Sequence, residues 1–154
     1  MSPTLALLLV ALAIAVAWSL KHGGLLPRRY RDRSCQGREW KKAFPTASAA
    51  EIGAFLSVFV SAFAFKDDKK LKLQPQDTIM QIYRALYPSK WQADALEVET
   101  LAIDLRKHYG LELSSIWSPE LTLGQVFEHA KLTRATAHPV TPNPSLNPRL
   151  RSRG

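Results

Sequence analysis

The sequence is poor in the residues that build metal sites and covalent catalysis. It contains one cysteine, Cys35, among 154 residues, so an intrachain disulfide and a cysteine-based metal cluster are excluded. The four histidines are too scattered along the chain to form a recognisable metal motif. The sequence also has no Gly-rich phosphate-binding loop and no nucleophile elbow. We therefore expect no enzyme activity, no cofactor, no metal and no small-molecule substrate.

Acidic residues are scarce at both ends of the chain, although the net charge of the whole is +8. Residues 21–42 hold eight Lys and Arg against Asp32 and Glu39, and residues 131–154 hold five with no acid. The segment between them is therefore mildly acidic. Because the positive charge flanks the middle instead of covering it, a nucleic-acid-binding domain is not expected.

Residues 3–20 contain no charged side chain and are mostly Leu, Ala, Val and Ile. Eighteen helical residues span roughly 27 Å, close to the ~30 Å hydrocarbon core of a bilayer. The positive residues follow this segment, which predicts a single-pass anchor in the cytoplasmic (inner) membrane, as in bacteria, with the C-terminal part in the cytoplasm. A cleaved signal peptide is the alternative, because 15–17 (Ala-Val-Ala) offers a small-residue cleavage pattern.

Residues 21–42 are interpreted as a basic juxtamembrane linker. Gly23, Gly24 and Pro27 interrupt helical periodicity there. Membrane lipid is the predicted partner of its arginines, because each cation near anionic headgroups contributes about 1 kcal/mol. The candidates for this contact are Arg28, Arg29, Arg31 and Arg33. A solvated linker that only sets the membrane topology is the alternative, and Cys35 is either a free thiol or an S-acylation site.

A domain over residues 43–131 is predicted to be all-α. Its first helix lies within 43–65, begins at a Ser48–Glu51 capping box and carries a stripe of large apolar side chains. The uncharged part of this stretch is only fourteen residues long, which favours a core helix over a second membrane span. Asp77 or Thr78 caps a short second helix, and Thr122 to Gln125 form a capping box for the last. The Pro-rich, basic residues 132–154 are predicted to be disordered.

The stretch 94–113 predicts the most regular helix of the domain. Asp94 lies at its start, and Gly110 is suited to end it in a left-handed conformation. One apolar stripe recurs at helical spacing over three turns and consists of Val98, Leu101, Ala102, Leu105 and Tyr109.

Three local motifs resemble the acyl carrier protein family: 94–97 (Asp-Ala-Leu-Glu), 109–113 (Tyr-Gly-Leu-Glu-Leu) and 122–128 (Thr-Leu-Gly-Gln-Val-Phe-Glu). The resemblance covers about residues 48–131 and implies a small helical bundle. In that family a serine at the position of Ala95 carries the phosphopantetheine arm. Alanine has no hydroxyl to form the phosphodiester, so this chain is expected to have the shape of a carrier without its chemistry.

The expected function is a non-catalytic, membrane-tethered protein-interaction module. The resemblance points to the exposed side of helix 94–109 as the surface for an unidentified cytoplasmic or membrane protein. Its candidate docking residues are Asp94, Glu97, Glu99, Thr100 and Asp104. Two alternatives remain open: an accessory subunit of a membrane complex whose anchor makes the contacts, and a carrier modified at another serine such as Ser89.

Overall fold

The computed structural model describes residues 24–88 and 95–137. The predicted anchor at 3–20, Asp94, Ser89 and residues 138–154 lie outside these ranges. The described helices are α2 (Arg28–Arg31), α3 (Gly37–Ala43), α4 (Ala49–Ala62), η1 (Asp67–Lys72), α5 (Ile79–Leu86), α6 (Leu96–Tyr109), η3 (Leu113–Ser115) and α7 (Leu123–Ala137). Over the described ranges the fold is all-α, as predicted, with one isolated bridge between Thr78 and Thr122.

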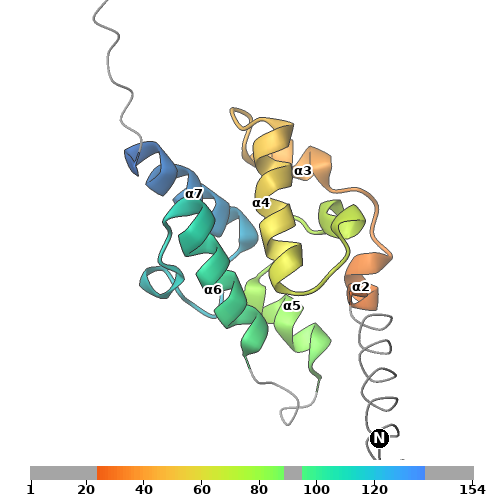
Figure 1. Ribbon diagram of the computed structural model, residues 1–154. Coiled ribbons are helices and arrows are strands. Elements are labelled where there is room, and N and C mark those ends of the chain that lie inside the picture. The colour runs from red at the N-terminus through yellow and green to blue at the C-terminus, as the bar shows by residue number, and fades with distance from the viewer. Residues whose placement is uncertain (1–23, 89–94, 138–154) are drawn as a thin grey trace, which may run out of the picture.

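Helix α4 lies at the centre of the bundle, with α6 and α7 beside it (Figure 1). The predicted Ser48–Glu51 capping box is present: the Glu51 N–H donates to the Ser48 hydroxyl over 3.1 Å, and Glu51 accepts from the Ser48 N–H over 2.7 Å. The predicted stripe faces inward, since Ile52, Phe55 and Phe59 are almost fully buried. No helix of the described ranges is long and apolar enough to cross a membrane.

The α2–α3 segment belongs to the folded domain, which corrects the predicted linker over 21–42 for residues 24–42. Leu26, Tyr30 and Trp40 are buried, and the Trp40 indole N–H donates to the Leu73 carbonyl over 2.9 Å. Basic side chains dominate the local composition, and all of those described except Arg33 are exposed. The apolar residues between them pack inward, so the domain begins well before residue 43.

Helices α5 and α7 start side by side. Thr78 caps α5 by accepting from the Gln81 N–H over 3.1 Å, and Thr122 caps α7 by accepting from the Gln125 N–H over 3.2 Å. The Ile79 N–H donates to the Leu121 carbonyl over 3.2 Å, and the Leu123 N–H donates to the Asp77 carbonyl over 2.9 Å. Two separate stretches of chain are thus tied together at one level of the bundle.

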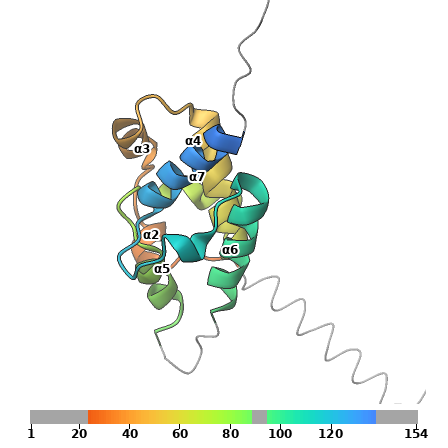
Figure 2. The same ribbon diagram turned by 90° about the vertical axis from the view of Figure 1, so that its left-hand side faces the viewer.

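Helix α7 continues to Ala137, which corrects the predicted boundary between domain and tail at residue 131. Its buried contacts end at Ala130, and Leu132 is 60% exposed. The second view shows α7 alongside α4 and α6, with its last turn at the upper end of the molecule (Figure 2). No proline lies between Ala130 and Pro139, so nothing in this stretch breaks the helix where its packing partners end.

Candidate protein-docking surface on helix α6

Helix α6 packs one side against α4 and α7 and presents the other to solvent. Leu101, Leu105 and Tyr109 of the predicted stripe are buried, with Val98 and Ala102 partly so. Gly110 ends the helix with φ +68°, in the left-handed conformation that the sequence predicted. Because one side of α6 is packed against the bundle, the residues on its opposite side are held toward solvent.

Ala95 is the N-cap residue of α6 and is exposed. Its φ of +61° lies in the left-handed region, and its N–H donates to the Tyr83 hydroxyl over 2.9 Å. The residue that the sequence resemblance compares with the carrier serine thus lies at the start of α6, and its side chain is a methyl group.

Two of the predicted docking acids are turned toward neighbouring elements. Glu97 is half-buried and accepts a hydrogen bond from the Tyr87 hydroxyl, while its other carboxylate oxygen is buried with no hydrogen-bond partner in the described residues. Asp104 lines a hollow against α4 with Ser57, Asp67 and His108. These carboxylates lie on the flank of α6, so the predicted set does not form one surface.

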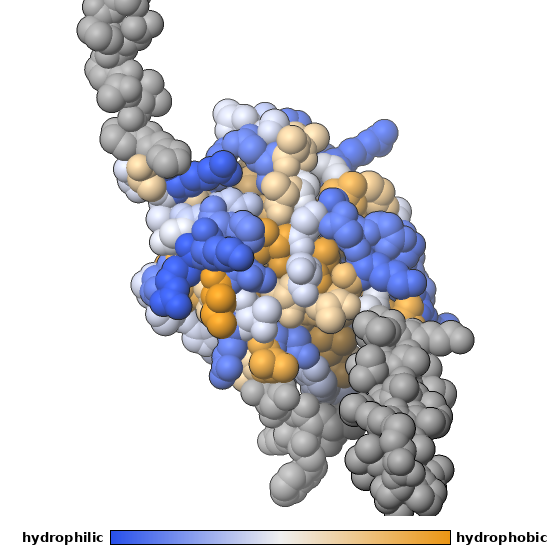
Figure 3. All heavy atoms as spheres, viewed as in Figure 1, coloured by the Kyte–Doolittle hydropathy of each residue, from blue (hydrophilic) through white to orange (hydrophobic). Residues whose placement is uncertain are grey.

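Glu99 and Thr100 lie on the solvent side, together with two large apolar residues that the sequence interpretation missed. Leu96 is 58% exposed and Ile103 is 57% exposed. Figure 3 shows hydrophobic surface over α6 between hydrophilic side chains. Both residues fall outside the inward stripe and are seven positions apart, nearly two turns, which was the signal available in the sequence.

We define the outer face of α6 as its solvent-directed residues. Besides the four just described, Arg106 and Lys107 are exposed in the last turn. Arg106 approaches Glu112 at 3.6 Å, with both side chains more than half exposed. The outer face consists of Leu96, Glu99, Thr100, Ile103, Arg106 and Lys107.

The arginines predicted to contact lipid separate into two groups. Arg28 and Arg29 are exposed, and the side chain of Arg31 is 43% exposed. Arg33 instead pairs with Asp77, a carboxylate that is only 3% exposed, through contacts of 2.7 and 2.9 Å. Its role is inside the domain, which corrects its assignment as a lipid contact.

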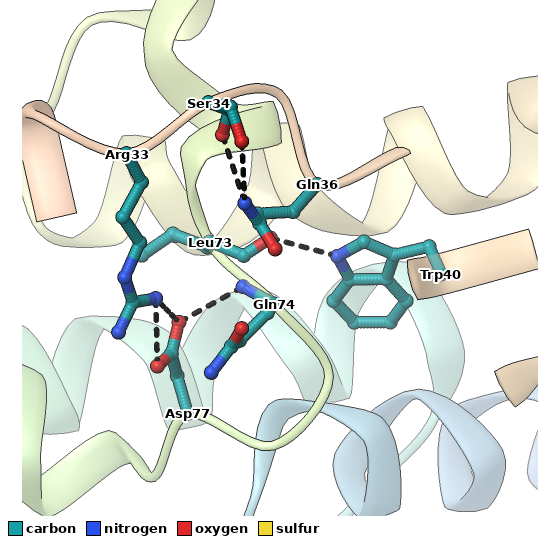
Figure 4. A network of polar contacts seen from close by, with 7 residues as sticks. All are labelled: Arg33, Ser34, Gln36, Trp40, Leu73, Gln74 and Asp77. Atoms are coloured by element: carbon teal, nitrogen blue, oxygen red, sulfur yellow. Dashed lines mark hydrogen bonds and ion pairs between the residues drawn. The ribbon is translucent and has the colours of Figure 1, made fainter. Parts of the chain in front are cut away.

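The Arg33–Asp77 pair belongs to a polar network that joins the α2–α3 segment to the loop before α5 (Figure 4). Asp77 also accepts from the Gln74 N–H over 2.8 Å, and the Gln36 N–H donates to the Leu71 carbonyl over 2.7 Å.

The Arg33 guanidinium lies 4.7 Å from the Tyr30 ring centroid. Burial raises the pKa of the Tyr30 phenol, against the opposing effect of Arg29. The network is a structural clamp between distant segments.

The described residues form further surface hollows. One lies between α4, α6 and α7 and is lined by Glu51, Tyr109, Phe127, Lys131 and Arg134. Glu51 is engaged in the capping box, and the Lys131 ammonium lies 5.7 Å from the Phe127 ring centroid. Within residues 24–88 and 95–137, no group of three or more His, Cys, Asp or Glu is placed to hold a metal.

Comparison of the chain with protein-family models, with curated proteins and with solved structures gave no match.

Proposed function

We propose that this chain is a non-catalytic, membrane-tethered protein-interaction module with an acyl-carrier-protein-like bundle that carries no phosphopantetheine. Its anchor at 3–20 lies in the cytoplasmic membrane, and the bundle docks a protein partner through the outer face of α6. The observation that carries the proposal is the pair of exposed apolar side chains, Leu96 and Ile103, at the centre of that face.

The chemistry of the outer face supports docking over catalysis. A large apolar side chain on a helix provides contact area on a backbone that is already ordered, so binding does not pay the entropy of ordering a loop. Glu99 and Thr100 border it with polar groups, and the Thr100 hydroxyl donates to the Leu96 carbonyl over 2.8 Å. An apolar centre with a polar border is the arrangement found in protein–protein interfaces.

A pull-down with full-length, detergent-solubilised protein tests the docking proposal. We expect Ile103→Ser and Glu99→Lys each to reduce recovery of the partner at least several-fold. Glu128→Lys is the matched control, because Glu128 is an exposed acid on α7. Unchanged recovery with both outer-face variants would refute docking through α6.

The carrier-like part of the proposal has its own test at Ala95. Ala95 is exposed at the N-cap of α6, so a hydroxyl introduced there is accessible. Under the proposed resemblance it takes the place of the family's serine. We expect Ala95→Ser to gain a phosphopantetheine arm when co-expressed with a phosphopantetheinyl transferase, as measured by intact mass. The unsubstituted chain is the control: an arm on it would show a carrier modified at another serine.

The second candidate is an accessory subunit of a membrane complex in which the anchor makes the functional contacts. The exposed Arg28, Arg29 and Arg31 on α2 favour it, because they do not take part in the Asp77 clamp and follow the apolar segment 3–20 after only residues 21–27. Replacing residues 3–20 by an unrelated membrane helix separates the two. Loss of the partner after that replacement favours the accessory subunit, and retention favours docking through α6.

A further inference from the structure

The outer face of α6 is organised as three parallel lines of residues. Residues seven positions apart stand nearly two turns apart and therefore lie along one line of the helix surface. Leu96, Ile103 and Gly110 form the central line, with exposed positions throughout. Glu99 and Arg106 form the line on one side, and Thr100 and Lys107 form the line on the other.

Charge along these lines changes sign about Ile103. Glu99 lies one turn before it, while Arg106 and Lys107 lie one turn after it. An antiparallel copy of α6, related by a two-fold axis at Ile103, brings each residue before the axis beside one after it. Glu99 of each copy then faces Arg106 of the other, and Thr100 faces Lys107.

From this self-complementarity we propose that the occupant of the outer face is a second copy of this chain, paired antiparallel through α6. The proposal rests on the docking function proposed above and names its partner. Ile103 meets its own counterpart on the axis. Leu96 of one copy lies at the level of the exposed Gly110 of the other.

The alternative pairings do not fit the charges as well. In a parallel two-fold pair the two flanking lines face each other, so Arg106 of each copy faces Lys107 of the other, and like charges across an interface are destabilising. Glu99 then faces only Thr100. A partner of uniformly basic or acidic charge complements only one half of the face. A second copy in antiparallel orientation satisfies both halves with one contact repeated twice.

Disulfide trapping in the full-length protein tests the position of the axis. In a Cys35→Ser background, Ile103→Cys places a thiol beside its own copy, within the Cα separation of about 4.4–6.8 Å that a disulfide spans. Leu132→Cys is the control, because Leu132 is a similarly exposed apolar residue, at 60%, on a different helix, α7. We expect mild oxidation to give a covalent dimer for Ile103→Cys and at least tenfold less for Leu132→Cys. Equal yields would overturn the proposal.

Charge reversal tests the orientation without altering Ile103. Sedimentation of the full-length protein in density-matched detergent should show a several-fold loss of dimer for Glu99→Lys and for Arg106→Glu. The double variant Glu99→Lys with Arg106→Glu restores the pair with reversed signs and should recover the dimer. Failure of the double variant to recover overturns antiparallel self-pairing.

The outcomes separate this proposal from the proposed function. If a different protein occupies the outer face, Glu99→Lys still reduces its recovery in the pull-down, yet Ile103→Cys does not cross-link. That result overturns the second copy and leaves docking through α6 standing. If neither assay responds to the outer-face variants, both proposals fall.

Discussion

Asp77 is a charge that the fold can bury only because Arg33 reaches it. Its carboxylate accepts from the Arg33 guanidinium and from the Gln74 N–H, forty-four residues separating the ion pair. Arg33→Met removes the cation and leaves Asp77 buried. Since Arg33 is itself 23% exposed, we expect a loss near the lower end of the roughly 3–5 kcal/mol typical of such deletions.

Urea unfolding followed by circular dichroism measures this loss. The matched control is Arg28→Met, because Arg28 pairs with Asp32 at 3.5 Å on an exposed surface. Its effect should stay within about 0.5 kcal/mol. Equal midpoints for the two variants would show that the Arg33–Asp77 contact does not hold the α2–α3 segment.

Ser48 and Glu51 give a pH-dependent prediction at the start of α4. Hydrogen bonds from the Ser48 backbone N–H and side chain lower the pKa of Glu51 below its ordinary value of 4.5. Because the pKa of Glu51 is lowered in the folded state, its ionised carboxylate stabilises the fold at pH values above the ordinary pKa. This contribution to stability is lost as the pH falls through the lowered pKa. Ser48→Ala should raise the pKa of Glu51 toward 4.5, as measured by NMR titration of its carboxyl carbon.

Ser61→Ala is the control for that titration, because Ser61 lies at the other end of α4 and is exposed. It should leave the Glu51 titration unchanged. A Glu51 pKa that is insensitive to Ser48→Ala would mean that the Ser48 hydroxyl does not help to lower it and that only the Ser48 backbone N–H does so.

At the scale of elements, the glycines of α4 and α7 should respond oppositely to the same substitution. A Cβ on Gly53 of α4 meets no atom within 4 Å, whereas a Cβ on Gly124 of α7 lies 3.1 Å from the Pro75 carbonyl oxygen and 3.2 Å from its Cβ. Gly53→Ala should therefore stabilise the fold by roughly 0.5–1 kcal/mol through reduced backbone entropy. Gly124→Ala should destabilise it by about 1–3 kcal/mol through overpacking.

Thermal unfolding of the two variants side by side measures both signs. The comparison is internally matched, because each variant adds one methyl group to a helix. A gain in both would show that α7 shifts away from the Pro75 loop without cost, and that the α5–α7 junction is loosely packed.

The helices α4 and α6 were predictable from the sequence, and α2 and α3 were not. Long apolar stripes with a capping box or a terminal glycine gave both the position and the inward side of α4 and α6. In the α2–α3 segment the aromatic residues Tyr30 and Trp40 are isolated among cations, so composition indicated a linker. The Trp40 indole donates to the Leu73 carbonyl, and Arg33, which lies over the Tyr30 ring, pairs with Asp77. Both partners are more than thirty residues away and cannot be found from local patterns.

The candidate site was predictable as a helix but not as a surface. Acidic residues were selected because of the family resemblance, and Glu97 and Asp104 turned out to face α5 and α4. Leu96 and Ile103 were passed over because an apolar residue in a helix is ordinarily assigned to the core. Only the packing of α6 against α4 and α7 shows which apolar line is left outside.

At the scale of the whole molecule, the folded unit includes the described residues before 43 and those of α7 beyond 131, so it is longer than the predicted 43–131. Leu26, Tyr30 and Trp40 each fill the core from the N-terminal side. Burying a large apolar side chain contributes roughly 1.5–3 kcal/mol, and small domains have a net stability of only about 5–15 kcal/mol. Removing all three therefore consumes most of the available stability.

This argument predicts different behaviour for two fragments of the chain. A fragment of residues 24–137 should unfold cooperatively on heating and give dispersed amide resonances. A fragment of residues 43–131 also leaves Asp77 without Arg33 and the Leu73 carbonyl without its indole donor. It should show reduced helicity and no cooperative transition.

A third fragment, residues 24–131, isolates the contribution of the last turns of α7. The residues of α7 beyond Ala130 are largely exposed, so this fragment should unfold at a midpoint close to that of residues 24–137. If residues 43–131 unfold cooperatively at the same midpoint, then α2 and α3 are appendages and the core of this protein is the bundle of α4 to α7 alone.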